Sequence, residues 1–186
     1  VVLTTDSNVS AYSLPNTDDP LMAGNDAGTF EDLQNDLSLG GDIVLTKNYT
    51  FVSTDSGLAN GISVPNTVNS ITGSGNIVID GSQQARIFNI HSSHSIILTG
   101  ITFINANADG NGGSINSDGT LIISDCNFIN NTASGHGGAV YLGSGEGDTI
   151  TNCNFEGNGA GGNGGAIDWY AGSSKGQIAG STFTDN

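Results

Sequence analysis

The eleven residues TLIISDCNFIN, Thr120 to Asn130, recur in altered form along the C-terminal half of the chain. The same pattern is found in SIILTGITFIN (Ser95 to Asn105), DTITNCNFEGN (Asp148 to Asn158) and GQIAGSTFTDN (Gly176 to Asn186). Their alignment gives two apolar columns, one of phenylalanine (Phe103, Phe128, Phe155, Phe183) and one five residues earlier (Leu98, Ile123, Ile150, Ile178). Four copies at steps of 25, 27 and 28 residues indicate a repeat architecture.

A glycine-rich phrase recurs between the phenylalanine columns, as GNGGSINS (Gly110 to Ser117), GHGGAVYL (Gly135 to Leu142) and GNGGAIDW (Gly162 to Trp169). Each copy thus holds short apolar runs broken by Gly, Asn and Asp, without helical periodicity. One such coil cannot bury its inward face, but stacked coils bury theirs on one another. The sequence therefore predicts an all-β fold, a single-chain parallel β-helix of about five to six coils, with identical residues in ladders.

Asparagine follows each phenylalanine column at a predicted corner, and this residue tolerates the left-handed region of backbone conformation. The four asparagines concerned are Asn105, Asn130, Asn158 and Asn186.

Upstream of the repeats, TFEDLQNDLSLGG (Thr29 to Gly41) carries apolar residues at helical spacing. Thr29 with Asp32 forms a capping-box pattern and Gly40 is suited to end the helix. We expect residues 29–41 to be a helix that caps the first coil. Residues 1–28 are predicted to be an extended acidic arm, and residues 42–186 the β-helix, which continues or is covered beyond Asn186.

Charge and hydropathy exclude several classes of partner. The formal net charge is −15, and the basic residues are Lys47, Arg86 and Lys175. Such a surface repels nucleic acid and anionic lipid, and no apolar run is long enough to span a bilayer. The chain begins at Val1 without Met, which suits a mature secreted protein. The sequons at Asn8, Asn48 and Asn130 are compatible with surface glycosylation.

Cys126 and Cys153 occupy one column of the alignment, two residues before their phenylalanines. In-register strands bring such residues within the Cα separation that a disulfide accepts. Secretion favours the bond, and the alternative is two buried thiols acting as small apolar residues. Both alternatives are structural.

Catalysis and metal binding are not expected. Asn16-Thr17-Asp18 and Gly135-His136-Gly137 match motifs of pectin-cleaving hydrolases letter by letter, but the first lies in the arm and the second in a repeat corner. Arg86 has no carboxylate cluster beside it in sequence. His91 and His94 have a spacing seen in metal sites but lack a third ligand, so we expect no metal and no cofactor.

The segments IDGSQQARIFNI (Ile79 to Ile90), SIILTGITFINANADGNGGSI (Ser95 to Ile115) and NCNFEGNGAGGNGGAIDWY (Asn152 to Tyr170) resemble adhesin-like surface proteins of methanogenic archaea. The repeats are also similar to those of chlamydial polymorphic outer-membrane proteins. The resemblance covers about Gly28 to the end. It implies a right-handed parallel β-helix, secreted and held at the cell surface within a larger parent protein. The strictly anaerobic habitat that it also implies would favour reduced thiols at Cys126 and Cys153.

Two functional hypotheses follow. The first is a non-catalytic extracellular module for adhesion or envelope structure, in which Asp168 and exposed Trp169 and Tyr170 contact a glycan or a partner cell. For Trp169 and Tyr170, packing at a coil edge is the structural alternative. The second hypothesis is a self-assembling filament, in which Val1, Val2 and Leu3 of one copy add as a strand to the last coil of another.

Overall fold

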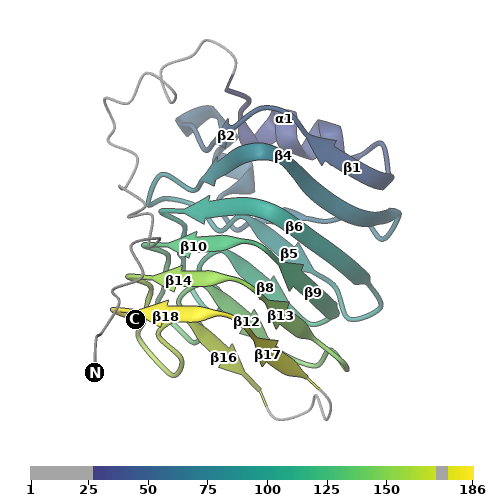
Figure 1. The fold of residues 1–186 in the computed structure, drawn as a ribbon. Helices are drawn as coiled ribbons and strands as arrows, with labels where there is room; N and C mark the ends of the chain where they lie inside the picture. The colour runs from purple at the N-terminus through teal and green to yellow at the C-terminus, as the bar shows by residue number, and fades with distance from the viewer. Residues whose placement is uncertain (1–26, 171–175) are drawn as a thin grey trace, which may run out of the picture.

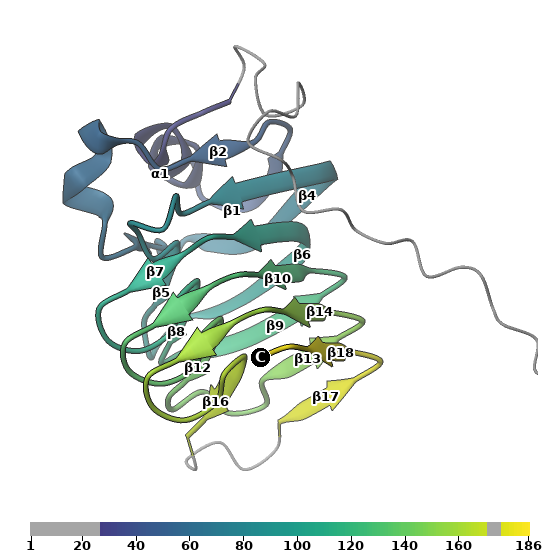
Figure 2. The ribbon, with the colours of Figure 1, turned by 90° about the vertical axis from the view of Figure 1, so that its left-hand side faces the viewer.

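The computed structural model describes residues 27–170 and 176–186, and these form a right-handed parallel β-solenoid of about five coils (Figures 1 and 2). The coils descend from the N-terminal helix to the C-terminal strands, and corresponding strands lie one beneath another. A right-handed course is the rule for crossovers between parallel strands. The predicted fold class is confirmed.

The strands make three sheets, in which every pairing is parallel. Sheet A contains β1 (Gly41–Leu45), β2 (Tyr49–Thr50), β4 (Val68–Asp80), β6 (Ser95–Ile104), β9 (Thr120–Ser124), β10 (Asn127–Ile129), β13 (Thr149–Thr151), β14 (Asn154–Glu156), β17 (Gln177–Ala179) and β18 (Thr182–Thr184). Sheet B contains β3 (Ile62–Ser63), β5 (Phe88–Ile90), β8 (Ile115–Ser117), β12 (Val140–Leu142) and β16 (Ile167–Trp169). Sheet C contains β7 (Asn107–Ala108), β11 (Thr132–Ala133) and β15 (Gly159–Ala160).

Both predicted apolar ladders are present in register. Phe103, Phe128, Phe155 and Phe183 pair in succession, and their rings stack with centroids 4.9, 4.8 and 4.9 Å apart. Leu98, Ile123, Ile150 and Ile178 pair likewise. The ladders extend upward beyond the repeats that the alignment detected, because Ile79 pairs with Phe103 and Ile71 with Leu98. The stacked rows fill the interior of the solenoid.

The glycine-rich phrase forms the corner between sheets C and B. Gly137 has φ +65°, a conformation that a residue with a Cβ rarely adopts. A Cβ on Gly138 would collide with the carbonyl oxygen of Gly165 in the next coil. The phrase recurs because each coil needs the same left-handed residue and the same close backbone approach.

The asparagine column predicted from the sequence is wrong in its register. Asn105 and Asn130 have φ of 50° and 54° as expected, but the equivalent corner residues in the next coils are Gly157 and Asp185, with φ of 64° and 53°. Asn158 and Asn186 lie one position further along, because the alignment counted two residues past phenylalanine in two copies and three in the others.

That next position forms a separate ladder inside the solenoid, of Asn131, Asn158 and Asn186. The Nδ2 of Asn131 donates to Oδ1 of Asn158 at 2.9 Å, and the Nδ2 of Asn158 donates to Oδ1 of Asn186 at 2.7 Å. Each Nδ2 also donates to a phenylalanine carbonyl in the preceding coil. Asn131 is fully buried, and Asn158 is 2% exposed. The ladder satisfies backbone groups at a corner that water does not reach.

The cap of the first coil is the helix α1 (Phe30–Leu37), whose buried residues are Phe30, Leu33 and Leu37. The predicted capping box of Thr29 and Asp32 is confirmed, and the helix is shorter than the predicted 29–41. The sequence did not reveal Asp55, in the short 3-10 helix η1 (Ser53–Leu58), which is 4% exposed. Its carboxylate accepts hydrogen bonds from the amides of Phe30, Glu31 and Val52. A residue distant in sequence therefore caps the helix N-terminus.

Arg86 joins the upper corners of the stack. Its guanidinium donates to the carbonyls of Gly112, Asn60 and Asn111 at 2.8–2.9 Å and to Oδ1 of Asn89 at 3.3 Å. The residue is 9% exposed, and burial lowers its pKa. A buried cation held by neutral oxygens and spanning the loops of successive coils is structural.

Asp148 gives the fold a pH dependence. The residue is fully buried, its Oδ1 accepts from the Leu121 amide at 2.8 Å and its Oδ2 has no protein partner. Burial raises the pKa of this carboxyl above 3.8, so the folded state binds a proton more readily than the unfolded state. This contribution to stability is present below the unfolded pKa and is lost as the pH rises through the folded pKa.

We therefore expect the stability of the native chain relative to Asp148→Asn to increase when the pH is lowered from 7 toward 4. Urea denaturation of both proteins at several pH values measures the difference, and Asp109→Asn, at an exposed corner, serves as the control. An unchanged difference across this range would show that Asp148 has the same pKa in both states.

Candidate functional site

The candidate ligand-binding residues lie on or just after β16, in the lowest complete coil. Tyr141 pairs with Asp168, and Leu142 pairs with Trp169. Because side chains alternate along a strand, Tyr141 and Asp168 face outward whereas Leu142 and Trp169 face inward. Trp169 packs against the core cluster and is only partly buried, while Tyr170 is 65% exposed.

The expectation that Trp169 is exposed is therefore wrong, and the packing alternative holds for this residue. A Cβ on Gly176 would collide with the indole ring, so Gly176, just before β17, lies against it. Trp169 continues an inward column that contains Leu142 and Ser117. Its indole ring covers the core of the solenoid at the lowest strand of sheet B.

The structure gathers other polar and aromatic residues around Asp168. The pKa of Tyr141 is raised, first by desolvation and then by the neighbouring Asp168, Asp118 and Tyr170. The Nδ1 of His136 lies 3.9 Å from Oδ2 of Asp168. We call Asp118, His136, Tyr141, Asp168 and Tyr170 the tyrosine–aspartate cluster.

Sequence reasoning found Asp168 and Tyr170 but missed the rest of the cluster. The signal was available, since the alignment of GGAVYL with GGAIDW places Tyr141 and Asp168 at one position of successive coils. Asp118 follows β8 in the coil above, so it lies at the end of the same sheet face. Stacking brings these residues together.

His136 serves the fold as well as bordering this cluster. Its Nδ1 accepts from the backbone amide of Asn163 at 2.9 Å, and its own amide donates to Oδ1 of Asn111 at 2.9 Å. His136 thus takes the place that asparagine occupies in the coil above. The GHG sequence is a variant of the repeated GNG corner.

The two histidines with a spacing seen in metal sites lie in different settings. His94 is 5% exposed, with its Nε2 2.6 Å from the Val68 carbonyl oxygen, while His91 is exposed. In the parts of the chain that the structure describes, no group of three or more His, Cys, Asp or Glu residues is arranged to hold a metal ion. Among the same residues, no helix is long and apolar enough to cross a membrane.

Cys126 and Cys153 are buried free thiols in adjacent coils. Each donates to the carbonyl two residues earlier, that of Ser124 or Thr151, at 3.2 Å. The neighbouring Cys153 thiol and burial raise the pKa of Cys126. Of the two alternatives left by the sequence, the structure contains the reduced form.

The sequons occupy different settings. Asn48 is partly exposed, and its Oδ1 accepts from the Val78 amide at 2.9 Å. Asn130 is also partly exposed, at the corner after β10. Asn8, the predicted donor strand Val1, Val2 and Leu3, and the Asn16-Thr17-Asp18 motif lie outside the described residues.

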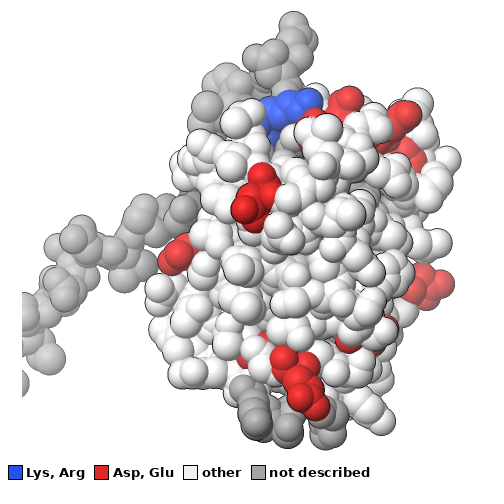
Figure 3. Space-filling view, turned by 90° about the vertical axis from the view of Figure 1, so that its right-hand side faces the viewer, with Lys and Arg blue, Asp and Glu red and all other residues white. Residues whose placement is uncertain are grey.

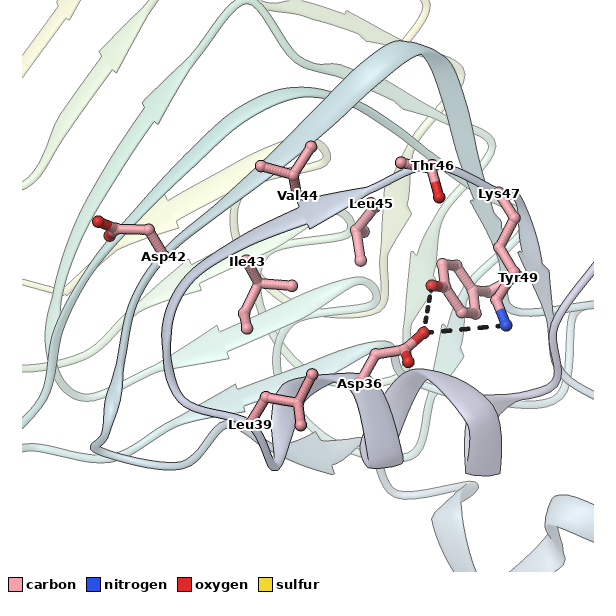
Figure 4. Close-up of a pocket in the computed structure, with 9 residues that line it drawn as sticks. All are labelled: Asp36, Leu39, Asp42, Ile43, Val44, Leu45, Thr46, Lys47 and Tyr49. Atoms are coloured by element: carbon pink, nitrogen blue, oxygen red, sulfur yellow. Dashed lines mark hydrogen bonds and ion pairs between the residues drawn. The ribbon is translucent and has the colours of Figure 1, made fainter.

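A groove of about 340 Å³ lies between the end of α1 and β1 (Figure 4). The polar side chains that line the groove bind one another. The Tyr49 hydroxyl donates a hydrogen bond to Asp36 at 2.6 Å, and the Lys47 ammonium lies 3.9 Å from the same carboxylate. Lys47 also lies over the Tyr49 ring, 5.4 Å from its centroid. Burial raises the pKa of Tyr49, so the phenol stays protonated as a donor. These contacts fasten the cap to the first coil.

The geometry defines the chain as a parallel β-solenoid with a helix over its first coil and a tyrosine–aspartate cluster on its side. No protein-family model, curated protein or solved structure matches it.

Proposed function

We propose that this chain is a non-catalytic extracellular module of a cell surface or envelope, and that it binds glycans through the tyrosine–aspartate cluster. The observation that carries the proposal is the outward placement of Tyr141 and Asp168 on adjacent rungs of sheet B, beside exposed Tyr170. Phenol rings offer apolar faces to a sugar ring, and carboxylates accept hydrogen bonds from its hydroxyls. Hydrogen-bonded strands hold these groups in place without a ligand, which reduces the entropy lost on binding.

Charge favours the same reading. A chain with a net charge of −15 repels anionic polymers, whereas uncharged sugar hydroxyls carry no such penalty. The resemblance to adhesin-like surface proteins supports the proposed location.

The test is titration of the chain with a panel of soluble neutral and acidic oligosaccharides. Replacing Tyr141 by alanine, or Asp168 by asparagine, is expected to weaken binding about tenfold or more, because the ring face or the charged acceptor is lost. Gln84→Ala, at an exposed corner away from sheet B, should bind as the native chain does. Equal binding by all variants would show that the tyrosine–aspartate cluster is not the binding site. Binding to no oligosaccharide would refute the proposed function.

A second candidate function is self-assembly into a filament. The observation that favours it is the exposure of Phe183 and Ile178, at 48% and 41%, on the last coil. An in-register strand from a second copy would cover these ladder residues and pair with β17 and β18. Light scattering over a range of concentrations, before and after deletion of Val1 to Thr5, tests it. Large species that the deletion abolishes would support strand exchange, and a monomer in both cases would exclude it.

A further inference from the structure

A second surface is distinguished by its lack of charge. The strands β1, β4, β6, β9, β13 and β17 run side by side, and each presents two outward side chains two residues apart. One column is Asp42, Ser70, Ile97, Ile122, Thr149 and Gln177, and the other is Val44, Thr72, Thr99, Ser124, Thr151 and Ala179. We call these twelve residues the hydroxyl face. Asp42, at its upper edge, is the one charged residue among them.

Figure 3 looks at this side of the molecule and shows carboxylates around the margin of a broad uncharged centre. Such a centre is unexpected on a chain with 18 acidic residues and a net charge of −15. Its members are at least partly exposed, and Ile97 is 42% and Val44 60% exposed. Exposed β-branched residues on a sheet face whose one carboxylate, Asp42, lies at the edge mark a surface suited to contact an uncharged partner.

The rows are regular and held in place. Parallel strands repeat about every 4.8 Å and alternate residues along a strand lie about 6.6 Å apart, so the side chains form a fixed grid. The Thr99 and Ser124 hydroxyls lie 3.1 Å apart, and the Thr151 hydroxyl donates to the Ile123 carbonyl at 3.4 Å. A hydroxyl that donates in this way still has lone pairs with which to accept from a ligand.

The size of the hydroxyl face argues against a second protein molecule. Six strands cover about 24 Å along the solenoid axis, and the three residues that the two columns span in each strand cover about 10 Å, which gives about 240 Å². A stable protein interface needs about 800 Å² from each partner. The face is instead long enough for several sugar units of an extended chain, whose repeated hydroxyls meet repeated rows.

We infer that the hydroxyl face binds a neutral, unbranched polysaccharide, which lies along the solenoid axis and crosses the stacked strands. The inference deepens the proposed function and rests on it, because it names the class of glycan and a second contact surface. An anionic polysaccharide is disfavoured by the carboxylates at the margin and by the net charge. Threonine methyl groups with Ile97 and Ile122 contact the apolar C–H faces of the sugars, while the hydroxyls bond to their edges.

The test is affinity electrophoresis in gels that contain a soluble unbranched neutral glucan, with polygalacturonate as the anionic comparison. The native chain should be retarded by the neutral polymer alone. Thr99→Glu and Thr151→Glu each place a carboxylate in the middle of the face and should weaken binding about tenfold or more, because the carboxylate loses water without gaining a partner. Gln84→Glu adds the same charge at an exposed corner and should leave the retardation unchanged.

The outcomes separate the two proposals. If Thr99→Glu and Thr151→Glu are retarded as strongly as Gln84→Glu, or if only the anionic polymer retards the chain, the hydroxyl face is not the site. Should oligosaccharides bind through Tyr141 while the glucan does not, this inference fails and the proposed function stands. Thr151→Val, which keeps the shape and removes the hydroxyl, should weaken binding less than Thr151→Glu does, and an equal loss would contradict the role of charge.

Discussion

Replacing Phe128 by alanine is expected to lower the free energy of unfolding by about 3–5 kcal/mol. Phe128 is fully buried, and its ring stacks between Phe103 and Phe155 at centroid distances of 4.9 and 4.8 Å. Alanine would remove both ring contacts and leave a cavity, which the coils above and below cannot close because their backbones are hydrogen-bonded in register. The midpoint of urea denaturation measures the loss.

Phe183 provides a matched control in the same ladder. Its ring stacks on Phe155 alone, and it is 48% exposed. Phe183→Ala is therefore expected to cost about 1 kcal/mol, since less apolar area is removed from contact. Equal losses for the two variants would mean that depth in the ladder does not determine the contribution of a ring.

The second large effect is expected at Asn131. Its Oδ1 accepts from the Ala106 amide at 2.9 Å and its Nδ2 donates to the Phe103 carbonyl at 3.1 Å, in a place without solvent. Asn131→Ala leaves the Ala106 amide buried without its acceptor and removes a donor from the Phe103 carbonyl, so we expect a loss of about 2–4 kcal/mol. Urea denaturation again provides the measurement.

Two further variants make this prediction specific. Asn131→Leu fills the volume without restoring the hydrogen bonds, so it should destabilise the chain by a similar amount. Recovery of stability in the leucine variant would show that packing, and not the hydrogen bonds, explains the effect. Asn127→Ala removes one hydrogen bond on the outer face, from Nδ2 to the Thr102 hydroxyl at 3.2 Å. It should lower the free energy of unfolding by less than about 1 kcal/mol.

Repetition explains why the fold was predictable. Each ladder residue appears in four copies, so the phenylalanine column and its partner column identified the coil without knowledge of the turns. The capping helix was predictable because its signals are local, with Thr29 and Asp32 three residues apart. Local signals do not depend on knowing which coil lies above which.

The features that the sequence did not reveal depend on contacts between coils. Arg86 occurs once, and its acceptors on Asn60 and Gly112 are both 26 residues away. Asp55 caps a helix that begins about 25 residues earlier, and no local sequence motif indicates this contact. The inward asparagines were concealed because two copies also carry asparagine one residue earlier, at Asn105 and Asn130, so that two neighbouring columns were taken as one.

The candidate site was only partly predictable for the same reason. Asp168 and Tyr170 were identified as residues suited to a glycan, but whether a side chain points outward depends on strand phase. The alternation of side chains along each strand places Trp169 inward and Tyr141 outward, beside Asp168. The hydroxyl face was missed because no single repeat contains it.

The stacking register supports every proposal made for this chain, and one cross-link tests it directly. Thr99 and Ser124 are paired in adjacent coils, with their hydroxyl oxygens 3.1 Å apart. In a Cys126→Ser, Cys153→Ser background, Thr99→Cys with Ser124→Cys should form an intramolecular disulfide on mild oxidation, because paired strands place their Cα atoms within bonding range. Thr99→Cys with Ile122→Cys, displaced by two residues, should form it much more slowly. Mass spectrometry of the oxidised monomers gives the result, and faster bonding in the displaced pair would contradict the register and the fold built on it.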